Sequence, residues 1–219
     1  DTGSLFRFHP NQERKPYHRF QHIYAPLTYS FMTWKWLLQK DFMQVLDYGN
    51  SDLFKARDQS LGMVWTKLIV GKSIHIGIFY VLPMLLGAPW HMVLWGNFLM
   101  HVMAGFILSI TFQLAHVVDK AEFPTEEEVK QSSILEHQLK TTANFATKNW
   151  LVTWYTGGLN FQVEHHLFPT INHVHYPKIA EIVRKTASEF QLPYNEYKST
   201  ISAVKAHFRH LRIMGMQPA

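Results

Sequence analysis

The sequence predicts an all-α fold built around an integral membrane helical hairpin, with cytosolic helices beside it. Three observations predict this class. No Asp, Glu, Lys or Arg occurs from Ser73 to Val118, which leaves room for two spans of roughly 20 apolar residues each. Charged residues make up 17% of the 219-residue chain, whereas a soluble domain carries about 25%. Aromatic residues reach 15%, and the C-terminal stretches show the periodicity of amphipathic helices.

The net charge of +5 has two interpretations. It attracts nucleic acid, or it reflects the Lys and Arg excess of cytosolic segments that flank membrane spans. The basic residues are scattered and form no nucleic-acid motif, so we favour the second interpretation and expect no nucleic-acid partner. The chain has no cysteine, which excludes disulfides, zinc ribbons and thiol catalysis. Its 14 histidines call for a separate explanation.

The segment before the hairpin divides into two parts. Residues 1–25 are polar and basic, and Pro10 and Pro16 are expected to break regular structure there. Residues 26–46 are amphipathic and rich in Trp and Phe, which suits the headgroup zone of a bilayer, but the pattern is too interrupted to predict a span. The chain opens on polar residues without a Met or a cleavable signal peptide, so we expect a fragment of a longer protein.

The uncharged stretch predicts a membrane hairpin over residues 66–114, with helices at about 66–86 and 92–114. Gly87-Ala88-Pro89 is expected to form the tight turn between them. The alternative is a pair of buried helices in a soluble protein, and two of this length in succession are uncommon there. Both ends of a hairpin lie on one side, which the positive-inside rule makes cytoplasmic. The basic residues that flank the hairpin are Lys55, Arg57, Lys67, Lys72, Lys120 and Lys130.

Residues 119–219 are expected to form the cytosolic part. Thr125 followed by Glu128 predicts a capping box that opens a helix. Pro177 is expected to open a second helix that Pro193 ends, and a last helix follows. The predicted apolar stripes are Ile179, Ile182, Val183 and Phe190 for the former, and Tyr197, Ile201, Val204, Phe208 and Leu211 for the latter.

Gln162, His165 and His166 predict a metal site. On a helix, positions i, i+3 and i+4 share one face, so an amide oxygen and two imidazoles can point at one spot. Neutral imidazole suits Fe, Zn, Cu and Ni alike, and the spacing does not choose among them.

His116 and His137 are further histidines outside that stretch. His116 ends the second predicted span, and an ionisable group at a membrane end is a candidate site residue; the alternative is a polar helix-end residue. His137 has no partner at ligand spacing and is expected to be structural.

Four separated stretches resemble the membrane fatty acid desaturases. Gly157 to Pro169, Gly-Gly-Leu-Asn-Phe-Gln-Val-Glu-His-His-Leu-Phe-Pro, resembles the third histidine box of that family. Its first position is Gln, as in the front-end desaturases, which act between an existing double bond and the carboxyl end, and in their sphingolipid relatives. The other resembling stretches are His18–Ala25, Phe112–Val117 and His137–Ala146.

The resemblance implies a site with two irons, held by histidines from three boxes and from one membrane-helix end. It implies that His165, His166, Gln162 and His116 are metal ligands, with no catalytic residue separate from them. The first two boxes, His-x-x-x-His and His-x-x-His-His, are absent from this chain. His18 and His22 have the first spacing but lie in a stretch that resembles the segment after box two. Residues 1–219 are therefore expected to be the C-terminal portion of a desaturase domain, inactive alone.

The resemblance also implies a reaction and its partners. The complete protein is expected to use O2 to introduce a cis double bond into a fatty acyl chain, with two Fe ions and electrons from cytochrome b5 or ferredoxin. A basic surface suits an acidic electron carrier. We expect a multi-pass protein of the bacterial inner membrane or endoplasmic reticulum, with its active site on the cytosolic face. The alternatives are a related membrane di-iron hydroxylase and a non-catalytic membrane scaffold with an incomplete site.

Overall fold

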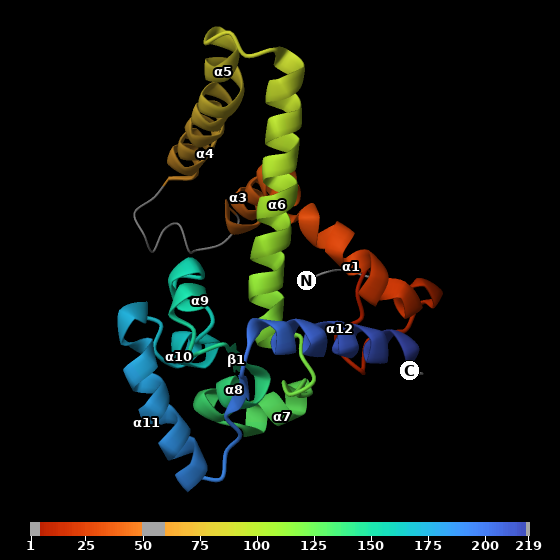
Figure 1. Cartoon of the computed structure of the whole chain (residues 1–219), viewed down its shortest axis with the longest axis vertical. Coiled ribbons are helices and arrows are strands. Elements are labelled where there is room, and N and C mark those ends of the chain that lie inside the picture. The colour runs from red at the N-terminus through yellow and green to blue at the C-terminus, as the bar shows by residue number, and fades with distance from the viewer. Residues whose placement is uncertain (1–4, 50–59, 218–219) are drawn as a thin grey trace. The chain divides into compact units, whose positions relative to one another are not determined.

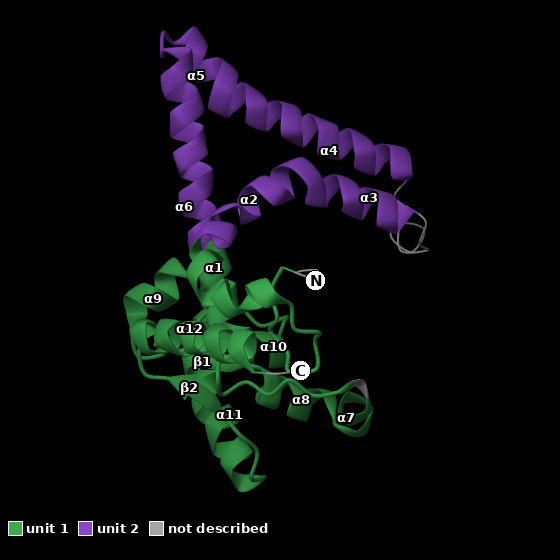
Figure 2. Cartoon of the chain, turned by 90° about the vertical axis from the view of Figure 1, so that its right-hand side faces the viewer, with its two compact units in different colours: residues 1–26, 108–219 green, residues 27–107 purple. Residues whose placement is uncertain are grey.

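The structure is a computed structural model that describes residues 5–49 and 60–217, and it is mostly helical (Figure 1). The chain forms two compact units (Figure 2). Unit 1 combines residues 1–26 with 108–219, and unit 2 comprises residues 27–107. The flanking residues Lys55 and Arg57, which entered the topology prediction, lie outside the described residues.

Unit 2 begins with a nearly continuous run of short helices. The second half of α1 (Gln21–Ser30) leads into α2 (Met32–Lys35), a π-helical turn η2 (Trp36–Lys40) and α3 (Asp41–Gly49). The sequence pattern of residues 26–46 was too interrupted to predict this continuity.

Two helices of membrane-spanning length follow. The first runs from Leu61 to Leu85 through α4 (Leu61–Ile76), the π-helical turn η4 (Gly77–Val81) and α5 (Leu82–Leu85), and the second is α6 (Trp90–His116). Both are longer than the predicted segments 66–86 and 92–114. None of the side chains of the first helix is buried, which argues against the alternative of core helices in a soluble protein.

Gly87 makes the turn between these helices. Its φ of 92° is left-handed, a region that glycine adopts without strain. Gly87 N donates to Met84 O and Ala88 N to Pro83 O, both at 3.0 Å, which is the Schellman end of a helix. Figure 2 shows the two helices meeting at this predicted turn, and Asn97 Nδ2 donates to Phe79 O at 2.8 Å between them.

In unit 1, the N-terminal segment packs on the last helix, α12 (Thr200–Met216). Pro16 begins a 3₁₀ helix, η1 (Pro16–Phe20), so it opens regular structure and does not break it. Arg7 is buried, and its guanidinium donates to the carbonyls of Met214 and Gln217, at 2.8 Å each. A cation at this position satisfies carbonyl groups that the end of a helix leaves without partners.

The acidic stretch after α6 folds as predicted. Thr125 and Glu128 form the capping box of α7 (Glu126–Gln131), with Thr125 N donating to Glu128 Oε2 at 2.7 Å. α8 (Ile134–Thr141) follows and is capped by Ser133.

Two strands add to the predicted all-α fold. β1 (Ala143–Phe145) pairs in parallel with β2 (Asn195–Tyr197), with Ala143 opposite Asn195. Strands of three residues carry too little periodicity to be recognised in a sequence. Around them lies a core cluster of Leu114, Val118, Ala121, Ala143, Phe145, Ala146, Tyr197, Ala203 and Ala206.

Between the strands lie α9 (Trp150–Tyr155), α10 (Gln162–Leu167), a 3₁₀ turn η5 (His173–His175) and α11 (Tyr176–Glu189). α11 begins at Tyr176, with the predicted Pro177 in its first turn, and ends at Glu189, before Pro193.

The buried faces of α11 and α12 differ from the predicted stripes. In α11, Val183 is buried but Ile182 is exposed, and Phe190 lies exposed just after the end of the helix. In α12, Leu211 is buried, but Ile201 is exposed and Tyr197 belongs to β2. The other buried positions are Tyr176, Ala180 and Ala187 in α11, and Ala203, Ala206, His207, His210, Met214 and Gly215 in α12.

Candidate metal centre

The structure brings three of the four predicted ligands together. Gln162 Nε2 lies 3.4 Å from His116 Nε2 and 3.2 Å from His166 Nε2. The two imidazole nitrogens lie 3.3 Å apart. Gln162 and His166 are one helical turn apart on α10, and His116 is the last residue of α6. All three residues belong to unit 1.

A tight turn positions α10. Gly157 and Gly158 have φ values of 59° and 81°, which glycine adopts without strain. A Cβ on Gly158 would also lie only 2.5 Å from His173 Cβ. These two glycines therefore allow the chain to reverse between α9 and α10.

Glu164 fixes α10 from its other side. Its side chain has no solvent exposure, and its two carboxylate oxygens accept from Asn144 Nδ2 at 2.8 Å and from Tyr194 OH at 2.9 Å. Asn144 Oδ1 in turn accepts from Val163 N at 2.9 Å. Burial raises the pKa of Glu164, and the two side-chain hydrogen bonds oppose that rise.

His207 supports the end of α6. Its Nδ1 donates to Val117 O at 2.7 Å, one residue after His116. Leu114 and Ala115, just before His116, are buried in unit 1. Packing and a hydrogen bond from α12 together hold His116 at the centre.

His165 faces a different neighbour. Its Nδ1 lies 3.3 Å from Tyr176 OH at the start of α11, and its ring centroid lies 5.6 Å from that of His166. The spacing allowed Gln162, His165 and His166 to point at one spot. In the structure, only Gln162 and His166 of these three lie within hydrogen-bond distance of each other. A hydrogen bond to one ring nitrogen is also what orients a metal-bound histidine, so the ligand role of His165 stays a prediction.

The three converging side chains fit a metal ion. Burial, followed by the neighbouring His116 and His165, lowers the pKa of His166 to about 4, so at neutral pH this imidazole is uncharged, as a ligand must be. Two nitrogen ligands each about 2.1 Å from a tetrahedral ion lie about 3.4 Å apart, close to the distances between these atoms. Rotation of the Gln162 amide exchanges its nitrogen and oxygen, which allows the oxygen to face the rings.

The three converging side chains supply only part of the coordination shell of a metal ion. Within residues 5–49 and 60–217, no group of three or more His, Cys, Asp or Glu side chains is arranged to hold a metal ion. Two imidazoles and one amide leave several coordination positions to other ligands, and they cannot hold two ions.

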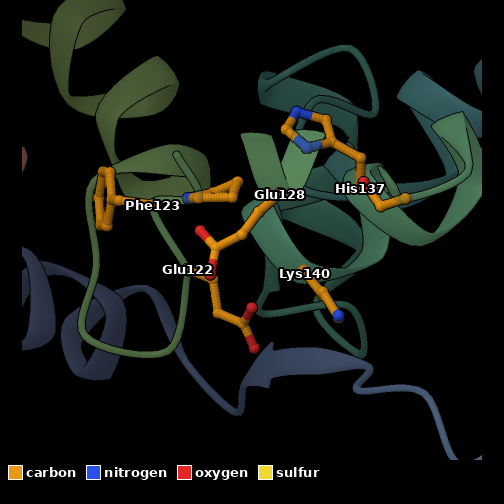
Figure 3. A pocket seen from close by; sticks show the side chains of 7 residues that line it. Glu122, Phe123, Glu128, His137 and Lys140 are labelled. Carbon is orange, nitrogen blue, oxygen red and sulfur yellow. The ribbon is translucent and has the colours of Figure 1, made fainter. Parts of the chain in front are cut away.

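His137 lies at a separate pocket. This pocket of about 220 Å³ is lined by His137, Glu122, Phe123, Glu128 and Lys140, among others (Figure 3). None of the four predicted ligands lines it. Two of its charged groups already have partners: Glu128 accepts from Thr125, and Lys140 pairs with Glu136 at 2.7 Å. We assign no function to this pocket.

Sequence reasoning missed Glu164, Tyr194 and His207. Glu164 lies inside the recognised motif, where an acidic residue directly after the apolar Val163 was the available signal. Tyr194 and His207 carried no signal, because their contacts join residues 30 and 90 positions apart.

Comparisons of the amino-acid sequence with known proteins match this chain to one family. The family profile described as fatty acid desaturase matches residues 1–198. An acyl-lipid (8-3)-desaturase of Physcomitrium patens is 36% identical over 94% of this chain and 43% of its own length. An sn-1 linoleoyl-lipid 6-desaturase of Arthrospira platensis is 32% identical over 98% of this chain and 58% of its own length. A Delta(5) fatty acid desaturase A of Dictyostelium discoideum is 31% identical over 95% of this chain and 46% of its own length.

The chain thus spans about half the length of the curated relatives it matches. No solved structure matches it. The matches confirm the resemblance to front-end desaturases over nearly the whole chain.

Proposed function

The chain belongs to the fatty acid desaturase family, and from this premise we propose that it forms the C-terminal portion of an oxidoreductase that introduces a cis double bond into a fatty acyl chain. The observation that carries the proposal is the convergence of His116, Gln162 and His166 at the end of a membrane-length helix. This is where the third histidine box and the helix-end histidine would have to meet.

Two iron ions, when bound to the complete protein, would supply with O2 the oxidant that an unactivated methylene requires. His116 and His166 would offer imidazole lone pairs to this group, and Gln162 its amide oxygen. His165 would contribute a further imidazole, with Tyr176 orienting its ring. The remaining ligands would come from outside this chain. Electrons would come from cytochrome b5 or ferredoxin, and the chain's net charge of +5 favours an acidic carrier.

Residues of unit 1 would keep His116, Gln162 and His166 in place during the reaction. Asn144 and Tyr194 bind Glu164 on the side of α10 away from these three residues. Glu164 therefore fixes the helix, and the three side chains stay available to bind a metal ion. Rigid support of this kind holds reacting groups within the small tolerance that catalysis needs.

The two membrane-length helices and the family together indicate a membrane protein. We place both ends of the pair on the cytosolic face, in a multi-pass protein, because basic residues flank the pair there. An acyl chain in the bilayer and a soluble electron carrier would then both reach the site.

The test is product analysis of the full-length protein in a host that lacks the product. We expect acyl chains with one added cis double bond and two irons per protein. His166→Ala should abolish the product and lower the iron content. His91→Ala is the matched control, because His91 lies on the same helix as His116 but roughly 37 Å away along it, and it should retain activity. A hydroxylated product would identify the rival hydroxylase, and absence of both iron and product would identify a scaffold.

A further inference from the structure

The outer face of α9 carries four exposed apolar side chains. Trp150 and Trp154 are 73% and 74% exposed, and Leu151 and Tyr155 are 53% and 63% exposed. Residues four apart are neighbours on a helix, so the two tryptophans form one row, with Leu151 and Tyr155 forming the row beside it. Single exposed apolar residues are ordinary, but a contiguous group of this kind indicates a surface that contacts something.

The inner face of α9 is fixed to the end of α6. Val152 packs against the core cluster that contains Leu114, and Ile110 packs against the same cluster. Ile110 and Leu114 lie in the last two turns of α6, within unit 1. α9 is therefore attached near the point where a helix of membrane-spanning length ends.

The composition of the outer face matches one environment. Tryptophan and tyrosine are enriched where a membrane meets water, because their rings have an apolar body and a polar tip. Lys148, two residues before α9, is exposed, and a lysine beside anionic headgroups is attracted to the surface. A helix end that leaves the bilayer brings its attached neighbours to this depth.

We propose that α9 lies in the headgroup zone of the bilayer, with Trp150, Leu151, Trp154 and Tyr155 inserted among the lipids. α9 is then a membrane-contacting element in addition to the two long helices, and it rests on the surface without crossing. The proposal requires α6 to be a membrane span but does not depend on desaturase activity.

Hydrogen bonds to Asn160 connect α9 with α10, which carries part of the candidate metal centre. Asn160 Nδ2 donates to Thr153 Oγ1 on α9 at 3.0 Å, and Thr156 Oγ1 donates to Asn160 Oδ1 at 3.3 Å. Phe145 N donates to Asn160 O at 3.0 Å. Gln162 follows two residues later. The membrane surface that holds α9 thereby sets the depth of α10.

Spin labels on the full-length protein in phospholipid vesicles test the proposal. The described chain has no cysteine, so Trp150→Cys, Leu151→Cys and Trp154→Cys each introduce one label once any cysteine elsewhere is replaced. Lys185→Cys on α11 is the control, since its side chain is 81% exposed. Each label is relaxed by oxygen, which concentrates in the bilayer, and by a water-soluble nickel chelate.

We expect the oxygen-to-nickel ratio at the three α9 positions to exceed that at position 185 several-fold. Equal ratios would place α9 in water and overturn the proposal. Labels that neither agent reaches would show that protein covers the face, either another segment or a second copy, and would overturn it as well.

A second measurement avoids cysteine substitution. Lipids brominated near the headgroup quench tryptophan fluorescence on contact. We expect the amount of fluorescence that these lipids quench, per mole of protein, to be smaller in the Trp150→Phe/Trp154→Phe variant than in the unaltered protein. An equal quenched amount would show that neither tryptophan meets the lipid, and the proposal would fail.

Discussion

Glu164 is a buried acid whose two carboxylate oxygens are both hydrogen-bonded inside the protein. Burial raises the pKa of Tyr194, and the adjacent Glu164 raises it further, so the phenol stays a proton donor at all ordinary pH values. The network that holds α10 therefore depends on single hydroxyl and amide groups that are distant in sequence.

We expect Tyr194→Phe to lower stability. It leaves one oxygen of Glu164 without its donor, and an unsatisfied buried polar group costs about 1–3 kcal/mol. The expected result is a lower melting temperature of the purified protein in detergent. Tyr155→Phe removes an exposed hydroxyl and should leave the melting temperature unchanged; equal effects of both variants would mean that the network contributes nothing.

Because His207 is buried, we expect the protein to lose stability in acid. Burial lowers its pKa to about 4, despite the opposing hydrogen bond to Val117. An unfolded histidine titrates near 6.5, so between these values the unfolded chain binds a proton that the folded chain does not. Stability should fall as the pH drops from 6.5 towards 4, by about 3 kcal/mol at most for this group.

His210, whose pKa burial also lowers, acts in the same direction. Thermal unfolding at a series of pH values measures the effect. His207→Gln removes the titrating group and should flatten the pH dependence; a slope as steep as in the unaltered protein would contradict the assignment.

At the scale of elements, the sequence predicted what depends on length and local chemistry. The two long helices followed from an uncharged run, the Gly87 turn from glycine, and the α7 start from a capping box. The buried face of α12 was not predicted, because it accommodates His207 and His210, which an apolar periodicity does not count. The candidate site shows the same difference between local and remote features. Helical spacing predicts that Gln162 and His166 lie on one face, whereas the role of Glu164 depends on contacts with remote residues.

Gly215 on α12 marks a close crossing of two elements. A Cβ at this position would lie 2.1 Å from His18 O in η1, so a side chain would force the backbones apart. We expect Gly215→Ala to destabilise the protein by about 1–3 kcal/mol, seen as a lower melting temperature. Gly96→Ala in α6 is the matched control. It has open space around it and should be neutral or stabilising by up to about 1 kcal/mol. Similar losses for both would argue against the crossing.

At the scale of the whole molecule, the two long helices predict which parts of the chain face which side of the membrane. Ala88 in the turn and Lys130 on α7 should lie on opposite sides, with Lys130 in the cytosol. Single cysteines are introduced at these positions in protein expressed in the inner membrane of a bacterial host, and intact cells are treated with an impermeant maleimide, which should label Ala88→Cys at once. Lys130→Cys should react only after permeabilisation. Labelling of Lys130→Cys on intact cells would overturn the orientation.

The pairing of β1 with β2 has a consequence for synthesis. The paired strands lie roughly 50 residues apart in the chain, and the segment between them contains α9, α10 and α11. Closing a long loop costs conformational entropy before the contacts at its ends compensate. The ribosome releases β1 long before β2, and Tyr194, which holds Glu164, emerges just ahead of that second strand. α10 therefore lacks its support while most of unit 1 is being translated, and His116, Gln162 and His166 come together in their supported arrangement only after Tyr194 and His207 have both left the ribosome.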